Sequence, residues 1–295
     1  MQKVALELLN DSRGADVVRP EYWIGLCPEM TIGGKASFER AQEPLVDSEA
    51  FRRDGYFFQS EVLPAVQTTA LAATIERLLS HGWPPIFAFV FDEFWGLAWT
   101  SAVRGTVASL LGRGPLLMPH VAVHYVEAGG SQGWTPHIDG TSVFDKRLTS
   151  WIPLTDATLT NGCIYVVPRS EDVEEAVTRF GKSETTHADA MSLLQHSRAL
   201  PAPAGSVLGW AFDVLHWGSG NLRASAPRVS VAYEWLGADV TPQEYELPLI
   251  DLDQGYPPLP QRLDCVARSI LSYYKFDAAL RPFEQLAKQL RRSGD

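Results

Sequence analysis

The period of the hydrophobic positions changes near residue 117, and this change separates a helical part of the chain from a β-rich part. Upstream, apolar residues from Leu71 to Leu79 recur at helical spacing, which predicts a helix that ends at Gly82. Asp92 predicts the cap of a further helix that continues to about Leu111. Residues 1–45 show no firm period, so we expect an irregular arm there.

Downstream of residue 117, short runs of β-branched and aromatic residues are separated by turn residues. The pair Asn161-Gly162 is a strong signal for a hairpin turn. Short strands at regular spacing are typical of a sandwich, a jelly roll or a barrel. The predicted strands cover residues 121–126, 148–154, 163–167, 206–210 and 228–235.

An acidic, helix-tending insertion, residues 170–204, interrupts the β-rich part. It is long for a loop in a compact domain, so we expect either a lid or a helical excursion. No repeat or flexible linker divides the chain. We therefore predict one domain, 1–295, with a mostly helical N-terminal part (1–116), a β core (117–240) that contains the insertion, and a helical C-terminal cover (241–295).

Composition limits the functions that the chain can have. Its 295 residues are 45% hydrophobic, which is ample for a sizeable core. A net charge of −10 gives no general attraction for nucleic acid or anionic membranes, and no apolar window is long enough to cross a bilayer. Three widely spaced cysteines suit a reducing compartment, and the first residues lack the apolar core of a signal peptide. We expect a cytoplasmic protein without nucleic-acid or membrane partners; the sequence leaves its oligomeric state open.

Within the β-rich part, His137 and Asp139 form a His-x-Asp pair that can hold a metal. In an extended backbone two residues at this spacing leave the same face of the strand. A distant His216 would complete a set of two histidines and one carboxylate, which is the ligand set of non-haem Fe(II) oxygenases. Taken alone, His-x-Asp is also a common solvated pair at a strand end, so the downstream residues decide between the two readings. Among the other histidines, His124 is the best further candidate for a residue that faces the pocket.

Arg228 follows His216 by twelve residues and begins an alternating run, so Arg228 and Ser230 share a face. A buried arginine beside a metal requires a carboxylate, which its guanidinium can bind through two parallel hydrogen bonds. This pair suits the anchoring of a dicarboxylic co-substrate; the alternative is an arginine paired with a structural Asp or Glu. Candidates for a dry aromatic wall, with core packing as the alternative, are Trp134, Trp210, Trp217 and Trp235.

Taken in this order, the motifs resemble those of the Fe(II)- and 2-oxoglutarate-dependent dioxygenases, specifically the phytanoyl-CoA dioxygenase-like family. The resemblance covers roughly residues 50–236. It depends on five segments: Thr135–Asp139, Ser150–Ala157, Asn161–Pro168, His216–Asn221 and Arg228–Ser230.

The resemblance implies a mainly β fold with flanking helices around a double-stranded β-helix, the jelly-roll or cupin-like core. It implies that His137, Asp139 and His216 bind Fe(II), and that Arg228 holds the distal carboxylate of 2-oxoglutarate. Trp151 would lie near the co-substrate, and Ser219 would match a co-substrate hydroxyl. The implied reaction uses O2, releases succinate and CO2, and most simply hydroxylates a small-molecule or acyl substrate.

Two departures from the family pattern concern the substrate rather than the metal. The chain has Pro168-Arg169-Ser170-Glu171 where the family often has Pro-Gly-Ser-His, and apolar Ile138 lies between the first two ligands. Asp139 occupies the position that a related halogenase leaves open, which argues against halogenation. Two alternatives stay open: a non-catalytic jelly-roll module that binds metal, and a cupin-type metalloenzyme that does not use 2-oxoglutarate.

Overall fold

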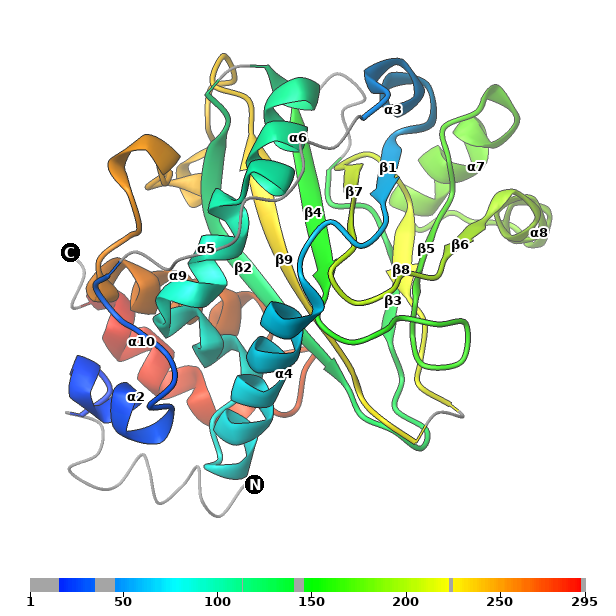
Figure 1. Ribbon diagram of the computed structural model, residues 1–295. Coiled ribbons are helices and arrows are strands. Elements are labelled where there is room, and N and C mark those ends of the chain that lie inside the picture. Colours follow the sequence, from blue (N-terminus) through cyan, green and yellow to red (C-terminus); the bar gives the residue numbers. More distant parts are fainter. Residues whose placement is uncertain (1–15, 35–45, 113, 141–145, 223–224, 293–295) are drawn as a thin grey trace.

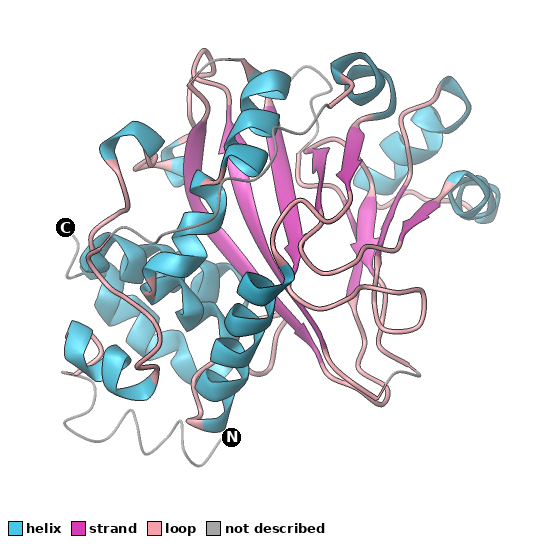
Figure 2. Cartoon of the chain, in the orientation of Figure 1, coloured by secondary structure: helices cyan, strands magenta, loops and turns pink. Residues whose placement is uncertain are grey.

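Two antiparallel β-sheets form the centre of the computed structural model, and helices flank them on both sides (Figures 1 and 2). The structure describes residues 16–34, 46–112, 114–140, 146–222 and 225–292. This arrangement confirms the predicted mainly β core with flanking helices. No helix in these ranges combines the length and the apolar composition that a membrane span requires.

The larger sheet supplies one wall of the interior. Its strand order is β1-β7-β4-β9-β2, and each neighbouring pair is antiparallel. On β9 the side chains of Val229, Val231, Tyr233 and Trp235 enter the core beneath the helices; the Tyr233 ring lies 5.6 Å from that of Phe89. The other face of β9 therefore points to the opposite sheet. The strands are β1 (Tyr56–Gln59), β2 (Leu116–Val126), β4 (Arg147–Pro153), β7 (Val207–Ala211) and β9 (Arg228–Leu236).

The smaller sheet has four short strands in the order β3-β8-β5-β6. The turn at Asn161-Gly162 leads into β5, and β5 pairs with β6 and β8 rather than with β4. The predicted hairpin of consecutive strands is therefore wrong, because the chain crosses here from one sheet to the other. The strands are β3 (Trp134–His137), β5 (Ile164–Val166), β6 (Arg198–Leu200) and β8 (His216–Gly218).

Helices from both ends of the chain gather on the outer side of the larger sheet (Figure 1). Both α9 and η2 pack directly against β2. The N-terminal group is α2 (Pro20–Leu26), α3 (Ser48–Asp54), α4 (Ala65–Ser80), η2 (Pro85–Val90), α5 (Asp92–Trp99) and α6 (Ser101–Leu111). The C-terminal group is η3 (Glu244–Glu246), η4 (Leu252–Gln254), α9 (Leu259–Tyr273), η5 (Arg281–Phe283) and α10 (Glu284–Arg292).

Two predictions for the N-terminal part need correction. The single helix predicted from Asp92 is two helices, because Thr100 adopts an extended backbone and its side chain caps α6. Asp92 is the first residue of α5 rather than its cap; its buried carboxylate pairs with Arg262. The arm predicted as irregular contains α2, which begins at a proline, a residue favoured in the first turn of a helix. The rest of that prediction, over residues 1–15 and 35–45, lies outside the described residues.

The insertion forms a helical pair, α7 (Glu171–Gly181) and α8 (His187–His196), on the far side of the smaller sheet (Figure 1). An ion pair between Arg179 and Asp189 joins the two helices. Their apolar residues pack with Leu215 and Ile138, and no residue of 170–204 lines the described cavity. The structure therefore favours the helical excursion over the lid.

Candidate functional site

His137 and His216 face each other directly across the β3–β8 ladder, with ring centroids 4.2 Å apart. Each Nδ1 lies at hydrogen-bond distance from a carbonyl oxygen two residues upstream: 2.8 Å to Thr135 and 2.9 Å to Val214. Since a carbonyl oxygen can only accept, both Nδ1 atoms carry the proton. The Nε2 lone pairs of both rings are thereby left free for a metal ion.

Asp139 brings a carboxylate to the same two nitrogens. Its Oδ1 lies 3.5 Å from His137 Nε2, and its Oδ2 lies 3.8 Å from His216 Nε2. One ligand atom from each of the three side chains lies within 4.8 Å of the others. The fold thus gathers the three residues that the sequence nominated, and two imidazoles with one carboxylate are a donor set that fits Fe(II).

The orientation of Asp139 is fixed by two side chains of the larger sheet. Thr149 Oγ1 donates to Oδ2 at 3.1 Å, and Trp210 Nε1 donates to the same oxygen at 3.2 Å. The ring of Trp210 also lies 4.3 Å from that of His216. Hydrogen bonds of this kind hold ligands in place and tune their metal.

Burial keeps two histidines of this region, His216 and His124, neutral. Desolvation lowers the pKa of His216 to about 4, although the carboxylate of Asp139 opposes the shift. Desolvation likewise lowers the pKa of His124 to about 3. A neutral imidazole binds metal without first losing a proton, so His216 can accept a cation at neutral pH. His124 lines the same cavity, as expected from the sequence.

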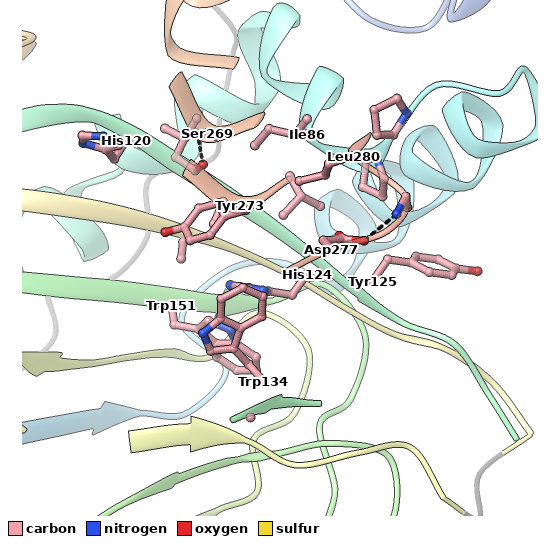
Figure 3. Close-up of a pocket in the computed structure, with 18 of the residues that line it drawn as sticks. Ile86, His120, His124, Tyr125, Trp134, Trp151, Ser269, Tyr273, Asp277 and Leu280 are labelled. Atoms are coloured by element: carbon pink, nitrogen blue, oxygen red, sulfur yellow. Dashed lines mark hydrogen bonds between the residues drawn. The ribbon is translucent and has the colours of Figure 1, made fainter. Parts of the chain in front are cut away.

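A cavity of about 520 Å³ lies between the two sheets above these residues. In Figure 3, Trp134, His124 and Trp151 lie at the sheet side of the cavity, and Ile86 and Leu280 close it from the helical side. The cavity walls therefore come from the β core, from η2 and from the chain around the end of α9. Its volume is sufficient for a dicarboxylic acid together with a small organic substrate.

Arg228 enters this cavity from β9 as a buried cation without a counter-ion. It is 2% exposed, and no carboxylate in the described part of the chain pairs with it. Its NH1 donates to Ser230 Oγ at 2.6 Å, while its Nε is buried without a hydrogen-bond partner. Burial lowers its pKa to about 10, so it remains charged at neutral pH. An unpaired buried guanidinium of this kind fits the carboxylate of a bound ligand.

Neighbouring residues shape the space around this guanidinium. The Trp151 ring centroid lies 5.4 Å from Arg228 Cζ, and Trp151 Nε1 is also buried without a partner. A Cβ at Gly162 would come within 2.7 Å of the Ser219 carbonyl oxygen and 3.4 Å of Arg228 Nε, and the residue has φ +109°. Glycine is therefore required beside the arginine.

The remaining nominated residues are placed as follows. Ser219 does not line the described cavity, and its hydroxyl donates to the Cys163 carbonyl oxygen at 3.2 Å. Trp134 and Trp210 line the cavity, whereas Trp217 stacks on Tyr165 and Trp235 lies in the core. Sequence reasoning missed the cavity residues Thr149, His120, Glu234 and Tyr273. Extending the alternation of β9 beyond Tyr233 would have placed Glu234 on the face of Arg228.

Fold and site together define a jelly-roll protein with a His-x-Asp…His cluster and a buried arginine in one cavity. The family model for phytanoyl-CoA dioxygenase (PhyH) matches residues 85–230. This match confirms the resemblance to the phytanoyl-CoA dioxygenase-like family that the motifs carry. A search of curated proteins found no match to the chain.

Solved structures of non-haem enzymes share the fold. The α-ketoglutarate-dependent epimerase SnoN from nogalamycin biosynthesis is 23% identical, with a TM-score of 0.50 over 65% of this chain and 79% of that one. The non-haem monooxygenase ThoJ is 16% identical, with a TM-score of 0.55 over 83% and 99%. EctD from S. alaskensis, solved with 2-oxoglutarate and 5-hydroxyectoine, is 16% identical, with a TM-score of 0.51 over 78% and 99%. At these identities the comparison establishes the double-stranded β-helix fold.

Proposed function

We propose that this protein is an Fe(II)- and 2-oxoglutarate-dependent dioxygenase that hydroxylates a small-molecule or acyl substrate and releases succinate and CO2. The observation that carries the proposal is Arg228, a buried cation without a carboxylate partner that shares one cavity with a His-Asp-His cluster. A structural arginine would have its acid within the fold. Arg228 has no such acid, as expected of an arginine that binds a diacid co-substrate.

The metal would be held by Nε2 of His137, Nε2 of His216 and the carboxylate of Asp139. Bound iron would supply the redox chemistry that couples decarboxylation of the co-substrate to oxidation of a substrate C–H bond. The carbonyls of Thr135 and Val214 keep the Nδ1 protons in place, so neither imidazole rotates away from the metal.

The co-substrate would be held by Arg228, with Ser230 keeping the guanidinium in position. Trp151 packs beside the guanidinium and excludes water from it, which strengthens the charged hydrogen bonds made there. The large aromatic side chains that line the cavity keep bulk water from the substrate, as oxidative chemistry requires.

The test is an anaerobic titration of the purified chain with Fe(II) and then with 2-oxoglutarate, followed by the metal-to-ligand absorption of the ternary complex. We expect an absorption band that appears only when both are present, and slow succinate formation when O2 is admitted. Metal binding without a response to 2-oxoglutarate would point to a metal-binding jelly-roll module or to a cupin-type enzyme. Substrates are then screened by the stimulation of succinate release.

A further inference from the structure

Glu234 is a carboxyl group in the cavity for which the fold supplies no partner. It lies on β9, two residues beyond Ala232 on the face of Arg228, and its side chain is 25% exposed toward the cavity. Within the described ranges, no side chain or backbone N–H donates a hydrogen bond to it. The nearest basic atom is Nδ1 of His120, 3.9 Å from Oε2, which is beyond hydrogen-bond distance.

His120 does not supply the missing charge. Burial, and next the positive charge of Arg268, lower the pKa of its imidazole, so the ring is neutral at neutral pH. Its Nδ1 is itself buried and has no hydrogen-bond partner. Buried polar groups are nearly always hydrogen-bonded. The buried Nδ1 of His120 and the partly exposed carboxyl of Glu234 face the same space without partners, and we take this space as the place of a ligand.

The cavity also holds more carboxyl groups than cations. A divalent metal and Arg228 together offset Asp139 and the two carboxylates of 2-oxoglutarate. Three further acids line the cavity, Glu127, Glu234 and Asp277, and no lysine or second arginine does so among the described residues. Burial, followed by the carboxylates of Asp139 and Glu246, raises the pKa of Glu234 to about 8, as expected for a carboxyl that lacks a cation.

Glu234 lies close to the metal-binding residues. Directly opposite it on β4 is Thr149, the residue that donates to Asp139. Tyr273 reaches the same region from α9, and its ring lies 5.4 Å from that of Trp134 (Figure 3). A group bound at Glu234 would thus meet aromatic faces, which attract cations. Farther from the sheets the cavity wall is apolar and is formed by Trp83, Ile86, Leu280 and Phe283.

We propose that the substrate of this site is an amine with an apolar or aromatic body. Its protonated nitrogen donates to the Glu234 carboxylate and to Nδ1 of the neutral His120, and its body lies against the apolar wall that includes Ile86 and Leu280. The inference depends on the proposed function only in taking this ligand to be the substrate of the same site. A bound ammonium supplies the cation that Glu234 lacks, lowers its pKa and so holds it as a carboxylate. A neutral alcohol does not, so the site selects amines over alcohols of the same shape.

The test compares matched probes by calorimetry: tryptamine against tryptophol, and phenethylamine against 2-phenylethanol. Each is titrated into the full chain with Fe(II) and 2-oxoglutarate under anaerobic conditions, and again into metal-free protein. Wild type is expected to bind each amine roughly tenfold or more tightly than its alcohol, since a hydrogen bond to a charged group is lost with the alcohol. Glu234→Gln should abolish this preference, Glu234→Asp should retain part of it, and the control Glu127→Gln should keep it.

Two results would overturn the proposal: no preference for the amine in wild type, or a preference that survives Glu234→Gln. The second would place the amine at the metal or at Asp139. Circular dichroism and the 2-oxoglutarate absorption band show whether each variant is folded and loaded. Because the metal-free titration needs neither iron nor co-substrate, loss of the absorption band in wild type would refute the dioxygenase without deciding the amine preference.

Discussion

Trp210 donates its indole N–H to Asp139 Oδ2 at 3.2 Å. The same ring packs 4.3 Å from that of His216, so one side chain supports two of the three proposed metal ligands. It reaches them from the larger sheet, whereas the ligands belong to the smaller sheet and the loop after β3. Side chains of the larger sheet therefore orient proposed metal ligands that the smaller sheet and its loop carry.

Trp210→Phe should weaken Fe(II) binding by about 10- to 100-fold, because the carboxylate loses one of its two orienting donors. The measurement is competition with a chelating metal indicator. Trp99→Phe is the matched control, since Trp99 also donates its indole N–H, to the Leu252 carbonyl oxygen, but lies on α5. Equal metal affinity in both variants would show that Trp210 only fills space.

Arg228→Lys should weaken the binding of 2-oxoglutarate by roughly ten- to a hundredfold, because lysine keeps the charge but cannot form the bidentate pair of hydrogen bonds. Iron affinity without co-substrate should barely change. Ser230→Ala should give the same pattern more weakly, since its hydroxyl only positions the guanidinium. The absorption titration measures both affinities; unchanged 2-oxoglutarate affinity in Arg228→Lys and Arg228→Ala would remove the co-substrate assignment.

Ile138→Ala should destabilise the fold by about 1–2 kcal/mol, less than a fully buried isoleucine would, because Ile138 is only partly buried. Its side chain joins the loop between the ligands to α7 and α8, so Fe(II) affinity should fall as well. Urea unfolding and metal titration measure the two effects. Leu194→Ala, at a position on α8 that is 60% exposed, should change neither.

Stability should decline on acidification through the buried pair of Arg147 and Glu246. Burial raises the pKa of Glu246, but hydrogen bonds from Arg147 and the Gln243 N–H outweigh burial and bring it below the usual 4.5. A carboxyl with a lowered folded-state pKa stabilises the fold above its unfolded value, near 4.5. That contribution is lost as the pH falls through the folded value.

Glu246→Gln should therefore flatten the dependence of unfolding free energy on pH below about 4.5. At neutral pH it should cost about 3 kcal/mol, because Arg147 stays buried without its acid. Urea unfolding between pH 3 and pH 7 measures both. An unchanged acid slope in the variant would assign the acid sensitivity to other carboxyls.

The proposed ligands and the arginine could be read from the sequence because each lies in a short motif with a period of two. His137 and Asp139 are two residues apart, as are Arg228 and Ser230. The core strands were likewise predictable, because burial on a sheet imposes alternation or apolar runs over several residues. The short strands β3, β6 and β8 carry too few residues to show such a period.

The way in which the motifs come together in space could not be predicted from the sequence. The pairing of His137 with His216 and of Thr149 with Glu234 depends on how distant strands align, and that alignment is set by closure of the two sheets. Glu234 lies one position beyond the alternating run that was recognised. The break at Thr100 was hidden because helical spacing continues across it, while the cap that starts α6 is a single hydroxyl.

The cavity takes its two kinds of wall from different stretches of the chain. The metal cluster and Arg228 lie inside the family-matched residues 85–230, whereas Glu234, Tyr273 and Leu280 come after them. In the proposed assignment, part of the substrate-binding wall thus lies outside the family-matched residues, although His120 and Ile86 lie inside them. Under the proposed function, a chimera that exchanges residues 231–295 between relatives should change which substrate binds while it leaves the His-Asp-His cluster and Arg228 in place.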